Sequence, residues 1–203
     1  KMFVEKVLLA DAVVLCRCAP KQKAEVAMLL QKELGKSVCG IGDGGNDVGM
    51  IQAASVGIGI EGKEGRQAAL ASDFSVRKFK DIVLLILWHG RMSYLRSAQL
   101  ALLVVHRGFI QTAMQYFFML NFAYVSINLF NGYLNMFYGT FFTNFLVFSM
   151  IFDYDISRET AVAYPGLYRE CQRGTALNTK QFLLFVLKAV YQGAFVIFIT
   201  FLL

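Results

Sequence analysis

Residues 108–152 contain no Lys, Arg, Asp or Glu, whereas charged side chains are spread through the rest of the chain. A transmembrane helix needs about 20 mainly apolar residues, so this stretch is long enough for two. The polar sequence 128–132 divides it in the middle. We therefore predict a transmembrane hairpin over 104–152, with a first span at 104–127 and a return span at 133–152. The apolar run 181–203 predicts the start of a third span.

Positive charge lies at the two ends of this hairpin and not at its turn. Arginines occur in the predicted stalk helix 81–103 and again in the loop 153–180, and the turn at 128–132 carries none. By the positive-inside rule both ends of the hairpin face the cytosol. The protein is then a multi-pass integral membrane protein whose residues 1–90 are cytosolic. The net charge of +6 is spread without a Lys/Arg cluster, which argues against nucleic-acid binding.

Residues 1–80 read as part of a soluble domain. Apolar runs typical of buried strands alternate with helical patterns, which predicts a parallel, Rossmann-like sheet. The predicted strands are 12–16, 37–41, 56–60 and 74–76, and the predicted helices are 21–34, 46–54 and 63–71. The predicted fold class is therefore α/β plus membrane α-helical.

Two carboxylates stand on a glycine-rich turn, Gly42-Asp43-Gly44-Gly45-Asn46-Asp47, between a predicted strand and a predicted helix. Ligands of open α/β sheets bind at this edge, where strands end and helices begin. Carboxylate oxygens are the ligands that Mg²⁺ prefers, and a helix N-terminus favours a phosphate beside them. The alternative is a capped turn in which Asn46 or Asp47 is the N-cap and Asp43 stabilises the bend.

The turn and several other blocks resemble the type IV P-type ATPases, the phospholipid flippases, whose phosphorylation domain has a haloacid-dehalogenase-like fold. The blocks that carry this resemblance are the turn itself, 16–26, 48–54, 56–65 and 89–91. Further blocks resemble the subclass that works without an accessory β subunit, namely 61–65, 93–94, 106–108, 153–155 and 164–168. Both ends of the chain interrupt expected elements, so we expect a fragment of a longer protein.

The resemblance implies ATP and Mg²⁺ as cofactors and assigns roles to five residues. Asp43 and Asp47 would bind the metal, and Lys23, Asn46 and Asp47 would act on the phosphoryl group as catalytic residues. Arg17 would join Lys23, Asn46 and Asp47 at the ATP site. The alternative for Lys23 is a solvated surface lysine. No Asp-Lys-Thr-Gly nucleophile motif occurs in the sequence, so this chain alone is expected to be inactive.

The predicted membrane hairpin lacks the carboxylates that a cation pump would need to replace an ion's hydration shell. Arg107, Gln111 and Gln115 instead follow one another at i, i+4 and i+8, on one stripe of a helix. With Asn144, these residues are candidates for a phospholipid headgroup, phosphatidylserine or phosphatidylethanolamine. The alternative for the amides is helix–helix hydrogen bonding.

Two features depart from the family pattern. Arg107 stands where most flippases have a lysine, and Phe145-Leu146-Val147 stands where the family usually has a proline. The missing proline leaves open whether the return span has a helix break there.

Three functions fit these observations. The first is a fragment of an ATP-driven flippase of the Golgi, endosomal or plasma membrane. The second is a haloacid-dehalogenase-like phosphatase domain on a membrane anchor, and the third is an inactive truncated remnant. The predicted stalk, which runs directly into a two-span hairpin, favours the first.

Overall fold

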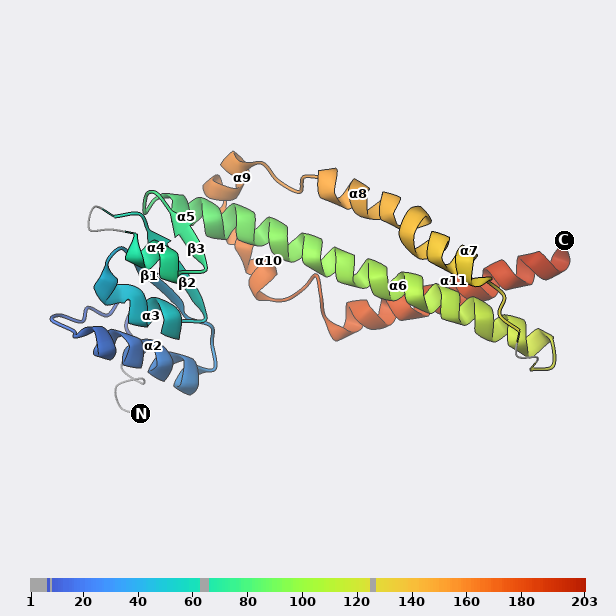
Figure 1. The fold of residues 1–203 in the computed structure, drawn as a ribbon, viewed down its shortest axis with the longest axis horizontal. Coiled ribbons are helices and arrows are strands. Elements are labelled where there is room, and N and C mark those ends of the chain that lie inside the picture. The colour runs from blue at the N-terminus through green and yellow to red at the C-terminus, as the bar shows by residue number, and fades with distance from the viewer. Residues whose placement is uncertain (1–6, 8, 63–65, 125–126) are drawn as a thin grey trace. The chain divides into compact units, whose positions relative to one another are not determined.

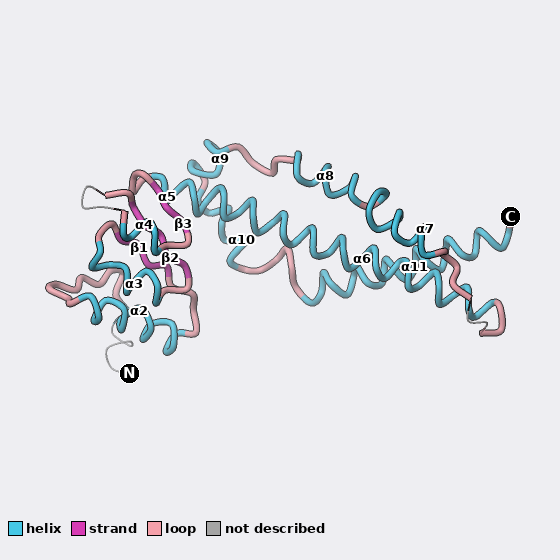
Figure 2. Tube along the Cα trace, in the orientation of Figure 1, coloured by secondary structure: helices cyan, strands magenta, loops and turns pink. Residues whose placement is uncertain are grey.

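A computed structural model describes residues 7, 9–62, 66–124 and 127–203. The chain forms two compact units, residues 1–82 and residues 83–203, and each is described by itself. The first unit contains a small parallel sheet with helices, and the second is helical (Figures 1 and 2).

The sheet of the first unit has three parallel strands in the order β1-β2-β3. They are β1 (Cys39–Gly42), β2 (Val56–Ile60) and β3 (Phe74–Val76). The connecting helices are α2 (Pro20–Leu34), α3 (Val48–Ala53) and α4 (Gln67–Ala71). Ile58 on the central strand is 1 % exposed, and it packs in a core with Ile51 and Ala68. The carboxyl ends of β1 and β2 therefore meet at one edge of the sheet, where the glycine-rich turn lies.

Local sequence explains where α2 begins and ends. Pro20 occupies the first turn, where its missing N–H costs no hydrogen bond, and the Gln22 side chain accepts from the Ala19 N–H at 2.9 Å. Gly35 ends the helix with φ +60°, a left-handed conformation that glycine adopts without strain. The helix predicted at 21–34 and the strands predicted at 56–60 and 74–76 are thus confirmed.

Other boundaries in this unit differ from the prediction. The strand expected at 12–16 is absent from the described residues, because no neighbouring strand pairs with this run and Val14 is 85 % exposed. The strand expected at 37–41 runs from Cys39 to Gly42. The helix expected at 46–54 is split into a 3-10 turn, Gly45–Asp47, and α3. The helix expected at 63–71 is described only as α4, since residues 63–65 lie outside the described residues.

The second unit is organised along one long helix. α5 (Asp81–Leu84), a π-helix (Leu85–Gly90) and α6 (Arg91–Asn121) follow one another without a break in helical backbone. The return segment consists of α7 (Gly132–Phe137), a second π-helix (Tyr138–Phe142) and α8 (Asn144–Phe152). The remaining elements are α9 (Arg158–Ala163), a 3-10 helix (Pro165–Tyr168), α10 (Arg169–Gln172) and α11 (Thr179–Leu202).

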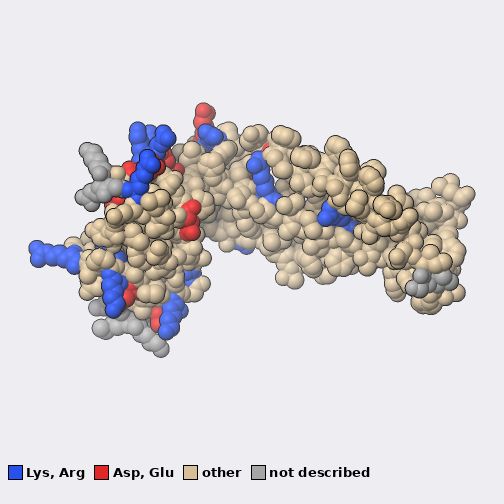
Figure 3. Space-filling view, viewed as in Figure 1, with Lys and Arg blue, Asp and Glu red and all other residues tan. Residues whose placement is uncertain are grey.

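Two helical segments of the described chain are long and apolar enough to cross a membrane, Gly132–Phe152 and Thr179–Leu202. They coincide with the predicted return span and third span. Few of their side chains are buried within the chain, and the visible face of the helical unit is almost free of charge (Figure 3). The first predicted span, 104–127, does not meet the same criterion, since Arg107 and several amides lie in it. Its helix also ends earlier, at Asn121, and Ala123 and Tyr124 then take left-handed φ values of +50° and +62°.

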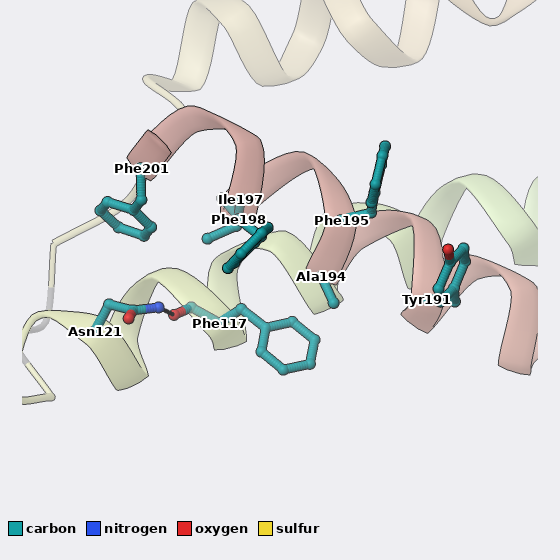
Figure 4. A pocket seen from close by; sticks show the side chains of 8 residues that line it. All are labelled: Phe117, Asn121, Tyr191, Ala194, Phe195, Ile197, Phe198 and Phe201. Carbon is teal, nitrogen blue, oxygen red and sulfur yellow. Dashed lines mark hydrogen bonds between the residues drawn. The ribbon is translucent and has the colours of Figure 1, made fainter. Parts of the chain in front are cut away.

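α6 and α11 pack closely because a glycine lies at their contact. A Cβ added at Gly193 would stand 2.7 Å from Ala113 Cβ and 3.0 Å from the Ile110 carbonyl oxygen. Small residues let membrane helices approach in this way. Beyond this contact the two helices diverge around a cavity of about 530 Å³ (Figure 4). Its lining consists of Phe117, Asn121, Tyr191, Ala194, Phe195, Ile197, Phe198 and Phe201.

The close contact predicts that Gly193→Ala destabilises the helical unit by about 1–3 kcal/mol, because overpacking forces the helices apart. Unfolding in detergent micelles, followed by circular dichroism, would measure the change in midpoint temperature. Gly108→Ala is the matched control, since nothing lies within 4 Å of the Cβ added there and alanine favours a helix. Equal midpoints for the two variants would contradict the contact.

Candidate functional site

The turn after β1 positions the two carboxylates differently. Asp43 follows directly after the strand and is exposed, while Asp47 closes the 3-10 turn and precedes α3. Asp47 occupies the N-cap position of α3, but its side chain makes no cap hydrogen bond. This observation weighs against the reading of the turn as a simple helix cap.

The Asp47 side chain instead bonds to Lys23, which lies on α2. Lys23 Nζ donates to Asp47 Oδ1 at 2.7 Å, and the two side chains are 31 % and 14 % exposed. The lysine predicted from the resemblance therefore meets the predicted carboxylate across 24 residues of sequence. The alternative of a fully solvated Lys23 does not describe this arrangement.

Glycines clear the space around both carboxylates. A Cβ at Gly42 would overlap the Asp47 side chain, so this position must be glycine for Asp47 to lie across the strand end. A Cβ at Gly62, in the segment after β2, would stand 3.1 Å from the Asp43 carbonyl oxygen. The two strand ends thus bring their backbones close together around Asp43, as ligand-binding turns commonly do.

The other predicted residues of this site are less closely joined to it. Asn46 is exposed on the 3-10 turn, between Asp43 and Asp47. Arg17 is exposed on the segment before α2, where it adopts a left-handed φ of +55°. No described side-chain hydrogen bond links Arg17 to the turn, so its assignment to the ATP site stays a prediction.

The donor set of the turn fits Mg²⁺ bound together with a phosphate. The described residues contain no group of three or more His, Cys, Asp or Glu side chains that would form a complete protein cage for a metal. Mg²⁺ rarely uses such cages, because it keeps several waters and takes one or two carboxylates plus substrate phosphates. Asp43 and Asp47 are carboxylates of this kind, and Lys23 carries the type of charge that pairs with phosphoryl oxygens.

Arg107 lies on α6 and reaches the irregular part of the return segment. Its Nη1 donates to the Gly139 carbonyl oxygen at 2.9 Å and to Thr143 Oγ1 at 2.6 Å. Gly139 belongs to the π-helix, and Thr143 is buried at its end. The return segment therefore has a break in its α-helix without the family's proline, several residues before Phe145.

The amides of the predicted stripe have distinct environments. Gln115 Nε2 donates to the Ile127 carbonyl oxygen at 2.9 Å, and its Oε1 accepts from the Leu129 N–H at 2.8 Å. Gln111 lies one turn before it and lines the same polar cavity of about 410 Å³, with Asn128 and Asn135. Asn144 is exposed at the first turn of α8. The structure thus brings Gln111 and Gln115 to one cavity and assigns Gln115 a structural contact as well.

One structurally important residue was missed by the sequence analysis, although it belongs to the quoted block 89–91. Arg91 is 5 % exposed at the start of α6 and bonds to three groups of the segment after α8. These groups are Asp155 Oδ2 at 2.8 Å, the Leu167 carbonyl oxygen at 2.7 Å and Glu170 Oε2 at 2.9 Å. Burial lowers the pKa of Arg91, but the bonds to the two carboxylates outweigh it and raise the pKa above its ordinary value.

Comparison with known proteins gives a consistent result. The family described as "Phospholipid-translocating P-type ATPase C-terminal" matches residues 69–203. Proteins named probable phospholipid-transporting ATPase IIB from Bos taurus and Homo sapiens are each 50% identical over 196 residues, 97% of this chain and 17% of their own length. Phospholipid-transporting ATPase NEO1 from Saccharomyces cerevisiae is 47% identical over 192 residues, 95% of this chain and 17% of its own.

Lys23 on α2 pairs with Asp47 of the glycine-rich turn, and the resemblance to P-type ATPases assigns both residues to the phosphoryl site. The same chain has two helices able to cross a membrane. The chain belongs to the phospholipid-translocating P-type ATPase family. It spans less than a fifth of the length of the curated relatives that it matches.

The contacts of Arg91 predict that Arg91→Gln releases the segment 153–172 from α6. Three charge-assisted bonds are lost, although the exposed Asp155 and Glu170 regain water, so we expect a local cost of about 1–3 kcal/mol. Hydrogen–deuterium exchange in this segment should then rise by about one order of magnitude or more. Arg173→Gln removes an equal charge from the exposed surface and should leave exchange unchanged. Wild-type exchange in Arg91→Gln would contradict the anchoring role.

Proposed function

We propose that the protein carrying this chain is an ATP-driven phospholipid translocase that works through an aspartyl-phosphate cycle. The observation that carries the proposal is the bond of 2.7 Å between Lys23 on α2 and Asp47 on the turn after β1. Its family and the printed names of its relatives, which are phospholipid-transporting ATPases, support the same function. In this proposal the first unit is the C-terminal part of a haloacid-dehalogenase-like phosphorylation domain.

Phosphoryl transfer needs positioning and charge neutralisation more than covalent help from the protein. Asp43 and Asp47 would hold Mg²⁺, which when bound would neutralise phosphoryl oxygens. Lys23 keeps Asp47 in place and presents its ammonium group toward the same edge of the sheet. Asn46 adds a neutral amide between the two carboxylates, and Arg17 is assigned to the nucleotide.

The proposed substrate is phosphatidylserine or phosphatidylethanolamine. Arg107 uses one nitrogen, Nη1, for its two described bonds, and a guanidinium has five N–H donors that match a phosphodiester. Gln111 lies one helical turn away on the polar cavity, and Gln115 and Asn144 complete the proposed headgroup residues. Because a charge at membrane depth is expensive, a residue such as Arg107 usually faces a partner or a cavity.

The remaining assignments follow the proposed subclass. The protein would work without an accessory β subunit in the Golgi, endosomal or plasma membrane. Residues 1–90 would lie in the cytosol, where ATP and Mg²⁺ are present. The segments 81–103, 104–152, 153–180 and 181–203 would form the stalk, the hairpin, a cytosolic loop and a third span.

The proposed metal role of Asp43 predicts that Asp43→Asn in the full-length enzyme abolishes Mg²⁺-dependent phosphoenzyme formation. The side chain is exposed, so the substitution should leave the fold intact. Phosphoenzyme formed from labelled ATP and trapped in acid is the measurement. Asp11→Asn, at an exposed position away from the turn, should form it normally. Wild-type levels in Asp43→Asn would refute the metal assignment.

The proposed headgroup role of Arg107 predicts a graded series in the full-length enzyme. Lipid-stimulated ATPase activity and apparent lipid affinity should fall from wild type to Arg107→Lys and further to Arg107→Gln. Lysine keeps the charge without the planar fork, and glutamine loses both. Gln111→Ala should change which headgroup stimulates best, because it removes one amide from the cavity.

A second variant separates headgroup binding from support of the π-helix. Thr143→Ala removes one partner of Arg107 but leaves its charge in place. It should therefore retain most of the lipid stimulation that Arg107→Gln loses. If Thr143→Ala loses as much, or if Arg107→Gln responds normally to a panel of headgroups, Arg107 serves packing alone.

A further inference from the structure

Two adjoining cavities lie between the start of α6 and the end of α8, away from every residue assigned above. The larger, of about 630 Å³, reaches from the first π-helix to Tyr154, and the smaller, of about 140 Å³, continues it along α6 and α8. Arg96, Ser97 and Ile151 line both of them. The two cavities thus form one groove, which we name the α6–α8 groove.

The groove changes from polar to apolar along its length. Its larger part is lined by Trp88, His89, Met92, Ser93, Phe152 and Tyr154, in addition to the shared residues. Its smaller part adds only apolar side chains, those of Leu100, Val147 and Met150. The lining residues of α6 are spaced four apart in the sequence, and those of α8 are mostly spaced three or four apart. This is the spacing of one helix face, so each helix presents one face to the groove.

Arg96 is the cation of this groove, and it is not neutralised by a carboxylate among the described residues. Its Nη2 donates to the Asp153 carbonyl oxygen at 3.1 Å, and its guanidinium lies 5.9 Å from the centre of the Tyr154 ring. Its Nε–H is buried without a hydrogen-bond partner in the described part of the chain. Asp153 lines a different cavity, with Gln99 and Phe185. A guanidinium that has no carboxylate partner and lines an open groove favours an anionic ligand.

The position of the groove favours a membrane lipid over a soluble anion. α8 belongs to a segment able to span the membrane, and the groove lies at its end next to the charged segment 153–172, which the positive-inside rule places at the cytosolic face. Exposed apolar side chains such as Phe152 surround the polar part. An amphipathic ligand would place its charged head in the polar part of the groove and its acyl chain in the apolar part.

We propose that the α6–α8 groove binds an anionic phospholipid of the cytosolic leaflet. The phosphate pairs with Arg96 beside Ser93 and Ser97, and an acyl chain lies in the apolar part against Leu100 and Val147. This lipid is a bound partner and not the transported molecule, because the groove contains neither Arg107 nor Gln111. The proposal does not depend on ATP hydrolysis or on transport.

Trp88 makes the groove directly testable, because it is the only tryptophan of the chain and lines the polar part. Its indole N–H donates to the Ile156 carbonyl oxygen at 3.1 Å, and Arg158 stacks 4.6 Å from the ring centre, so its position is fixed. The full-length enzyme, with any tryptophan outside this chain replaced by phenylalanine, is reconstituted in vesicles of phosphatidylcholine with increasing fractions of dibrominated phosphatidylglycerol or dibrominated phosphatidylcholine. Quenching of Trp88 fluorescence then reports how strongly each lipid occupies the groove.

Wild-type protein should prefer the brominated phosphatidylglycerol by about fivefold, the value expected for one arginine at a membrane surface. Arg96→Gln should reduce this preference to about one, and Arg96→Lys should retain most of it. Arg173→Gln, an equal charge change outside the groove, should behave as wild type. Equal quenching by both lipids in wild type, or an equal loss in Arg173→Gln, would overturn the proposal.

A second variant tests the apolar part without touching the charge. Ser97→Phe places a ring at a position shared by both cavities and should lower quenching by both lipids. An unchanged Trp88 emission maximum in unbrominated vesicles shows for each variant that the surrounding structure is intact. Water-soluble glycerophosphoglycerol at millimolar concentration should not restore the fluorescence. Full restoration, or unchanged quenching in Ser97→Phe, would mean that no acyl chain lies in the groove.

Discussion

The helical unit depends on hydrogen bonds from one long helix to the backbone of the segments around it. Side chains of the first π-helix and α6 donate to carbonyl oxygens of the return segment, its turn and the loop that follows α8. The donor–acceptor pairs are Trp88 to Ile156, Arg91 to Leu167, Arg96 to Asp153, Arg107 to Gly139 and Gln115 to Ile127. Where no water is present, an unsatisfied carbonyl costs several kcal/mol, so irregular backbone such as that at Gly139 is tolerated only beside a donor. α6 therefore supplies the donor that the irregular part of the return segment needs.

The return segment illustrates this dependence. A π-helix shifts the backbone bonding pattern, and here Arg107 and Thr143 both bond to the Gly139 carbonyl oxygen. A proline would create a break by removing a backbone N–H, whereas the return segment 132–152 contains no proline and shifts its helical hydrogen-bond register instead. The local break that the family's proline suggests is thus present in another form, and it depends on a residue 32 positions earlier in the sequence.

The sequence was informative wherever a local cause decides the structure. Pro20 and Gly35 limit α2 on their own, and the glycine-rich turn places Asp43 and Asp47 at the strand end as expected. It was less informative where the cause is distant. The run 12–16 is apolar enough for a strand, but pairing needs a neighbour that composition does not reveal. The anchoring role of Arg91 was missed, because its partners lie more than 60 residues away in the sequence. The same limit applies to the Lys23–Asp47 bond, because the family resemblance assigned both residues to one site but did not predict that they bond to each other.

The contacts also rank the residues proposed for the phospholipid headgroup. The Gln115 amide makes two hydrogen bonds to the backbone of the turn, because its nitrogen donates to one carbonyl oxygen and its oxygen accepts from one N–H. It can reach a headgroup oxygen only with its second N–H or by giving up a bond that holds the turn. Arg107 differs, because two bonds occupy a single nitrogen and a guanidinium has N–H groups on two others. Support of the backbone and binding of a phosphate are therefore compatible at Arg107, whereas at Gln115 they compete. An arginine in place of the family's lysine fits this double demand, because an ammonium group concentrates its three donors on one nitrogen.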